Sequence, residues 1–60
     1  MIKHGQVYER MGVQVVVLDV ANVGQLDEMI VYVFSDRRVF AVKTKEFEER
    51  FKKIKGYVYE

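Results

Sequence analysis

The chain has 60 residues, with ten Lys or Arg, nine Asp or Glu, one His and no Cys, and its formal net charge is +1. Sixty residues make one domain, placed at residues 1–60, and such a domain buries only ~60% of the surface that its unfolded chain exposes. Disulfides are excluded, and the lone His4 does not supply the four ligands of a structural zinc site. We therefore expect no metal or cofactor, and oligomerisation as the remaining support for a small core.

The same composition argues against a membrane or a strongly basic surface. The longest apolar run, Val15–Leu18, is far shorter than the ~20 residues of a membrane helix. The first residues lack the apolar stretch of a signal peptide. Basic and acidic residues nearly cancel, so net charge alone creates no strong field for nucleic acid. We expect a soluble protein of the cytoplasm without a membrane partner.

Up to about residue 42 the apolar residues follow the two-residue period of β-strands, and Gly, Asn and Asp mark the turns. Gly12 suits a tight hairpin because it tolerates a positive φ. The residues between the turns are rich in Val, Ile, Phe and Tyr, which favour a pleated surface. We expect four strands at about residues 6–10, 13–21, 28–34 and 38–42.

From Thr44 onward the apolar spacing becomes helical. Three side chains fall at i, i+4 and i+7, which places them on one stripe: Phe47, Phe51 and Ile54. We expect a helix over about residues 45–55, with Thr44 as its N-cap and Gly56 at a left-handed C-terminal cap. Acids precede bases along this segment, in the order that complements the helix dipole. Three ion pairs at i, i+4 are predicted, each contributing ~0.2–0.5 kcal/mol: Glu46–Arg50, Glu48–Lys52 and Glu49–Lys53.

The helical stripe should pack on alternate residues of the strands. One register buries Val16, Leu18, Val31, Val33 and Phe40, and a shift of one residue buries the opposite-facing set. The runs Val15–Leu18 and Met29–Phe34 are apolar at every position, so both of their faces need cover. This excess of apolar strand surface predicts that a partner covers it, either a second copy in a two-fold dimer or another protein.

Catalytic groups are sparse. His4 lies near a terminus, and Ser35 has no base beside it in the sequence. Asp19 stands among valines, where it is expected to face solvent or to bond a neighbouring backbone amide. Acid–base catalysis needs a second positioned group, and the scattered glycines form no phosphate-binding loop. We expect no catalytic residue, no enzymatic activity and no small-molecule substrate.

Tyrosines and basic residues are the candidates for an interaction surface. They are Tyr8, Arg10, Tyr32, Arg37, Arg38, Lys43, Tyr57 and Tyr59. Rings and cations together suit single-stranded nucleic acid. Alternatively, Tyr32 belongs to the sheet core and the basic residues are exposed strand ends, and interleaved acids such as Glu9 and Asp36 weaken the field. The sequence favours a protein partner, with nucleic acid as the alternative.

Four or five short strands with one terminal helix resemble an SH3-like or chromodomain-like small barrel. The glycine, apolar and aromatic positions of residues 5–18, 38–42 and 47–51 resemble short uncharacterised proteins of phage and prophage genomes. The fold class that we expect is α+β, mostly β, with a curved antiparallel sheet. The resemblance implies a small accessory or regulatory protein of the bacterial host cytoplasm, and it carries over no site residue. The outline also resembles small archaeal chromatin proteins, which are markedly richer in lysine.

Overall fold

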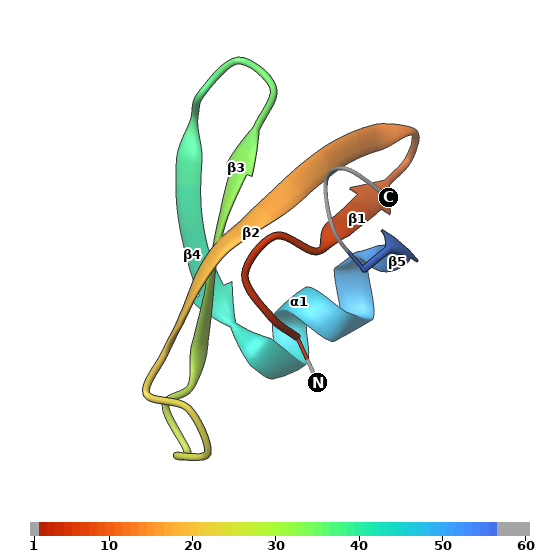
Figure 1. The fold of residues 1–60 in the computed structure, drawn as a ribbon. Helices are drawn as coiled ribbons and strands as arrows, with labels where there is room; N and C mark the ends of the chain where they lie inside the picture. The colour runs from red at the N-terminus through yellow and green to blue at the C-terminus, as the bar shows by residue number, and fades with distance from the viewer. Residues whose placement is uncertain (1, 57–60) are drawn as a thin grey trace.

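A computed structural model describes residues 2–56 as one antiparallel sheet and one helix (Figure 1). The strands are β1 (Val7–Arg10), β2 (Val13–Ala21), β3 (Met29–Phe34), β4 (Val39–Lys43) and β5 (Lys52–Lys55), and the helix is α1 (Thr44–Arg50). The strand order is β4-β3-β2-β1-β5, so β5 returns to pair with the first strand. The expected mostly-β α+β class, with four to five antiparallel strands, is confirmed for this part of the chain, which has five. The first four strands lie within about one residue of their predicted ends.

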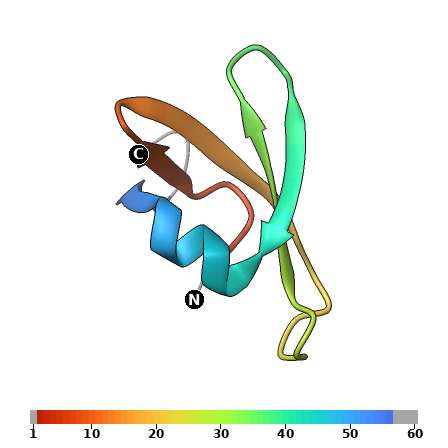
Figure 2. The same ribbon diagram turned by 180° about the vertical axis from the view of Figure 1, so that it is seen from behind.

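Two tight hairpins lie at one end of the molecule, and the β2–β3 loop lies at the other (Figures 1 and 2). Met11 and Gly12 join β1 to β2 with φ values of 53° and 83°, the two positive angles of a type I′ turn. In the β3–β4 turn, the N–H of Phe34 donates to the carbonyl of Arg38 at 2.9 Å, and Arg37 has a φ of 70°.

The core lies on the face of the sheet that α1 covers. Its buried residues are Tyr8, Val15, Val17, Ile30, Phe47 and Phe51, with Val20, Tyr32, Phe34 and Val42 packed beside them. Our first expectation, which buried Val16, Leu18, Val31 and Val33, was wrong by one residue, and the opposite-facing set is correct. Both faces of β2 and β3 are apolar, so alternation alone did not decide which face the helix covers. Phe40 does share the inner face, opposite Tyr32, but it remains 44% exposed.

A β-bulge explains part of the continuous apolar run in β2. Val17 pairs with Tyr32 and Asp19 pairs with Val31, so Leu18 is the extra residue. The bulge shifts the alternation, and Val20 joins Val15 and Val17 on the inner face. Asp19 is exposed, and its carboxylate accepts the N–H of Val20 at 2.8 Å, which confirms the expected solvent-facing position and bond to a neighbouring backbone amide.

The helix ends at Arg50, about five residues earlier than the spacing predicted. Phe51 is already extended, with φ −117° and ψ 145°, and the following residues form β5 against the edge of β1. Each i, i+4 pair offered only ~0.2–0.5 kcal/mol, whereas strand pairing satisfies a row of backbone groups and sets Lys52 directly opposite Glu9. Consequently Ile54 leaves the apolar stripe and is exposed at a register shift.

The predicted helix-end interactions change accordingly. Of the three expected ion pairs only Glu46–Arg50 forms among the described residues, at 3.6 Å. The N-cap is Lys43, not Thr44, and it makes no side-chain cap bond. The Thr44 hydroxyl instead donates to Glu28 Oε1 at 2.7 Å, which ties the start of α1 to the β2–β3 loop. Gly56 follows β5 and so cannot cap the helix.

Within residues 2–56, no helix combines the length and the apolar character needed to cross a membrane.

Candidate functional site

A continuous row of aromatic rings runs from the core to the hairpin end of the inner face. At the core, Tyr8 meets Phe47 edge-on at 4.8 Å between ring centroids, and Phe47 stacks on Phe51 at 4.6 Å. Phe47 and Phe51 remain one helical turn apart, so the shortened helix still places both rings under the sheet. These contacts anchor α1 to β1.

The row continues beyond the helix. Tyr32 lies 5.1 Å from Phe51 and 5.8 Å from Phe34, and Phe34 meets Phe40 edge-on at 5.5 Å. Tyr32, Phe34 and Phe40 are on β3 and β4, which extend past α1 toward the hairpin turn (Figures 1 and 2). Tyr32 and Phe34 are therefore only half-buried, although they belong to the same row as the fully buried Phe47.

A depression of about 330 Å³ opens where this row reaches the surface. We call it the hairpin groove, and its lining residues are Arg10, Met11, Val13, Tyr32, Phe34, Arg38 and Phe51. The β1–β2 turn forms one wall, the β3–β4 hairpin forms the other, and Phe51 contributes from the end of the helix. This volume is at the lower end of the ~300–1,000 Å³ of typical ligand sites. It suits one large side chain or a planar group.

All the polar side chains of the groove can donate hydrogen bonds, and the Tyr32 hydroxyl can also accept one. The guanidinium carbon of Arg38 lies 5.0 Å from the centroid of Phe34 and 5.9 Å from that of Phe40, which is cation–π distance. Its Nε donates to Asp36 at 2.6 Å, and its terminal nitrogens have no hydrogen bond with residues 2–56. Arg10 makes no ion pair or hydrogen bond through its side chain with that part of the chain, nor does the Tyr32 hydroxyl.

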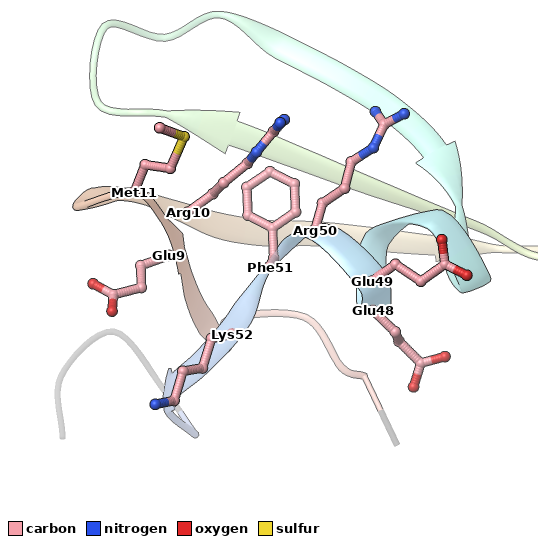
Figure 3. A pocket seen from close by; sticks show the side chains of 8 residues that line it. All are labelled: Glu9, Arg10, Met11, Glu48, Glu49, Arg50, Phe51 and Lys52. Atoms are coloured by element: carbon pink, nitrogen blue, oxygen red, sulfur yellow. The ribbon is translucent and has the colours of Figure 1, made fainter.

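A second depression of about 670 Å³ adjoins the first and shares Arg10, Met11 and Phe51 with it. Arg10 and Arg50 stand on either side of the Phe51 ring, and all three side chains point toward the β3–β4 hairpin (Figure 3). Glu9, Glu48 and Lys52 point away from that hairpin (Figure 3). The side facing the hairpin groove is thus cationic and aromatic, and the mixed charges lie on the other side.

Both hairpin turns hold long side chains in backbone conformations that favour glycine or asparagine. Met11 has a φ of 53° and is 91% exposed, so its side chain gains no core packing there. Arg37 has a φ of 70° in the β3–β4 turn and is also exposed. A left-handed conformation costs a non-glycine residue ~1–2 kcal/mol. Such outliers support a functional hypothesis when they flank a site.

The structure brings together three residues of the predicted interaction surface, Arg10, Tyr32 and Arg38. Arg37 adjoins them in the hairpin turn without lining the groove. Tyr8 is only 7% exposed, so its ring belongs to the core and not to a surface. Lys43 pairs with Met29, at the opposite end of β4 from the hairpin turn. Tyr57 and Tyr59 lie outside the described residues.

Sequence reasoning missed four groove residues: Met11, Val13, Phe34 and Phe51. Met11 was interpreted as a turn residue, and the other three as strand or core residues. One available signal was the residue type at the first central position of the β1–β2 turn, where Asn, Asp or Gly is usual and this chain has Met. The half-buried position of Phe34 depends on how α1 crosses β3 and β4 (Figure 1), which the spacing of apolar residues does not show.

Among residues 2–56, three ionisable groups have shifted pKa values, and each shift has a local cause. The N–H of Gly24 and the hydroxyl of Thr44 lower the pKa of Glu28. The backbone N–H of Arg38, then its side chain, lower the pKa of Asp36. Burial, with a contribution from the Glu48 carboxylate, raises the pKa of Tyr8. Glu28 and Asp36 hold turns together, so these shifts describe structural acids.

Residues 2–56 contain no group of three or more His, Cys, Asp or Glu side chains placed to hold a metal ion. Comparisons of the chain with models of protein families, with curated proteins and with solved structures found no match.

Proposed function

We propose that this chain is a non-enzymatic binding module that docks on another protein through the hairpin groove. The observation that carries the proposal is the lining of the groove, where half-buried rings lie beside two arginines and a tyrosine hydroxyl whose outer donors bond no other group of residues 2–56. Aromatic residues, Met and Arg are the types enriched at protein interfaces. Because the walls belong to two hairpins of one sheet, the groove is preformed and little ordering cost is expected on binding.

We further infer an SH3-like small barrel. The support is the strand order, in which β1 pairs with both β2 and β5 and the only helix of the described chain lies between β4 and β5. The corresponding biological setting is that of a phage-type accessory or regulatory protein in a bacterial cytoplasm. That setting rests on the glycine and apolar positions of the sequence, which report fold more than function.

Nucleic-acid binding is the second candidate, and the observation in its favour is the pairing of Arg10 and Arg38 with aromatic rings in one depression. Its surface is smaller than the sequence suggested, because Tyr8 is buried and Lys43 lies elsewhere. Phosphate contacts release counterions, so this binding would weaken steeply with salt. A mainly apolar protein contact would hold or strengthen.

Self-association is proposed for a different surface. Among the described strands β4 pairs only with β3, and its residues Val39 and Phe40 are exposed, so β4 is an apolar edge of this sheet. A second copy could pair antiparallel with this edge about a two-fold axis. Sedimentation at tens of micromolar should show a dimer for the parent chain and a monomer for Ala41→Pro, because proline removes a backbone donor. A parent chain that sediments as a monomer would contradict this proposal.

The docking function is tested by affinity capture from bacterial lysate with nuclease present. The parent chain is compared with Phe34→Ser in the groove and with Leu26→Ser, which is fully exposed in the β2–β3 loop at the opposite end. We expect one set of proteins to be retained by the parent and by Leu26→Ser, and lost with Phe34→Ser. Circular dichroism must show that Phe34→Ser is folded. Capture that is equal for all three chains, or that disappears with nuclease, would contradict the proposal.

A further inference from the structure

The charge pattern of the hairpin groove allows its partner to be described more closely. Of its seven lining residues two are cationic and none is acidic, whereas the adjoining depression contains three glutamates. The arginines of the chain are gathered at this end: Arg10, Arg38 and Arg50 line the two depressions, and Arg37 is in the same hairpin turn as Arg38. The groove therefore offers donors and positive charge beside an apolar floor.

We propose that the hairpin groove binds an acidic peptide segment of the partner, with one large apolar side chain in the depression and flanking carboxylates on Arg10 and Arg38. This inference rests on the proposed docking function and specifies its ligand. Guanidinium groups bind carboxylates through paired hydrogen bonds, and the terminal nitrogens of Arg38 are unused among residues 2–56. Arg38 is already held in place by Asp36 and by the two phenylalanine rings, so it is preorganised for a ligand.

The ring geometry favours a peptide over a nucleic-acid strand. Bases need exposed ring faces for stacking. In this groove Arg38 lies over Phe34 and Phe40, and Tyr32 stacks on Phe40, so part of the ring surface that a base would need is already in contact.

The rim of the groove supplies apolar contacts suited to a side chain. Met11 and Val13 are exposed on the β1–β2 side, and the flexible thioether of Met adapts to irregular apolar partners. Met11 occupies a backbone position where Asn or Gly would be easier to accommodate. A ligand that covers Met11 would explain why an exposed apolar side chain occupies this position.

The test is a titration of ¹⁵N-labelled protein with peptides that differ in one property at a time. The probe is Glu-Glu-Phe-Glu-Glu with blocked ends; Gln-Gln-Phe-Gln-Gln removes the charge, and Glu-Glu-Gly-Glu-Glu removes the ring. We expect saturable shifts of groove amides with the first peptide, and affinity at least about tenfold weaker with each of the others. A short oligo-dT strand tests the nucleic-acid alternative with the same readout.

Two variants test how much the positive charges of the groove contribute to binding of the acidic peptide. Arg10→Gln and Arg38→Gln should each weaken binding of the acidic peptide about tenfold, whereas Lys43→Gln, with the same loss of charge at the far end of β4, should leave it unchanged. Arg38→Gln also removes contacts within the hairpin. The Arg10 side chain has no partner among residues 2–56, so Arg10→Gln is the cleaner variant.

The outcomes separate this inference from the docking function. Equal binding of the acidic and the neutral peptide, or equal weakening by Lys43→Gln, overturns the acidic preference and leaves a protein-docking groove. The absence of groove shifts with all three peptides also overturns the inference, and the lysate capture then decides the docking function by itself. Oligo-dT shifts at the groove without any peptide shifts overturn both.

Discussion

The two ends of the inner face contain the same kinds of residue and differ in what covers them. At the closed end, α1 and β1 enclose Phe47, which has no exposed surface. At the open end, Tyr32 and Phe34 continue the same ring row beyond the helix and reach solvent. Rings at the closed end contribute mainly to folding, because their burial removes apolar surface from water. Rings at the open end keep part of that surface for a partner.

The largest effect is expected at the closed end. Phe47→Ala should destabilise the fold by ~3–5 kcal/mol, since it removes a fully buried ring and leaves a cavity. That is comparable to the whole stability of many domains of this size, so the variant should be largely unfolded by circular dichroism. Leu26→Ala, a fully exposed control in the β2–β3 loop, should leave the melting curve within about 0.5 kcal/mol of the parent. A folded Phe47→Ala chain with an unchanged melting temperature would contradict the packing described here.

Phe34→Ala sharpens the comparison because it removes the same ring at the open end. Half-burial predicts a smaller cost of ~1–2 kcal/mol to folding, but a loss of ~2 kcal/mol or more in binding of the acidic peptide. Denaturant unfolding and the peptide titration measure the two quantities separately. If the variant is destabilised as much as Phe47→Ala, or if it binds the peptide normally, the two ends do not differ in role.

Met11→Asn is expected to move stability and binding in opposite directions. Asparagine tolerates the left-handed backbone of the β1–β2 turn, so the variant should gain ~1 kcal/mol. For a domain of this size that corresponds to a rise of ~4–8 °C in melting temperature. Peptide binding should weaken because the apolar rim is lost. A variant that loses stability, or that binds more tightly, would contradict the interpretation that Met11 is retained for a partner.

The smallest effect concerns the β2–β3 loop at the far end of the sheet. The pKa of Glu28 is lowered in the folded chain by the N–H of Gly24 and the hydroxyl of Thr44. Its contribution to stability is therefore present above its ordinary pKa of 4.5 and is lost as the pH falls through the lower folded value. Glu28→Gln should flatten the fall in melting temperature below pH 4.5, and Thr44→Val should flatten it partly. An unchanged acid slope in both variants would show that these bonds do not persist in solution.

The strands could be predicted from the sequence because Gly12, Asn22 and Gly24 mark the turns on either side of β2, and residues 13–21 were predicted with the bounds that β2 has. The length of the helix could not. Its charge order and its Phe spacing both favoured continuation, but the free edge of β1 offers residues 52–55 a full strand partner. The pairing of β5 with β1 outweighed the local helix preference of these residues, and that pairing cannot be read from the sequence.

The candidate site, too, could be predicted from the sequence only in part. Arg10, Tyr32 and Arg38 were predicted from residue type, whereas Phe34 and Phe51 are site residues because β3 extends past α1 (Figure 1) and the helix ends at Arg50. The choice of inner face was also open, since β2 and β3 are apolar on both sides and β2 shifts its alternation at Leu18. Which aromatic residue reaches solvent is decided by packing between distant segments.

The central claim is that the open end of the inner face contacts a protein partner, and site-specific photo-crosslinking tests it most directly. A photoreactive phenylalanine analogue at position 11 lies on the rim of the hairpin groove, and the same analogue at position 26 lies in the β2–β3 loop, where Leu26 is equally open to solvent. We predict a discrete, nuclease-resistant protein adduct from position 11 that excess Glu-Glu-Phe-Glu-Glu reduces, and none from position 26. Adducts of equal yield at both positions, or an adduct at position 26 alone, would contradict the account.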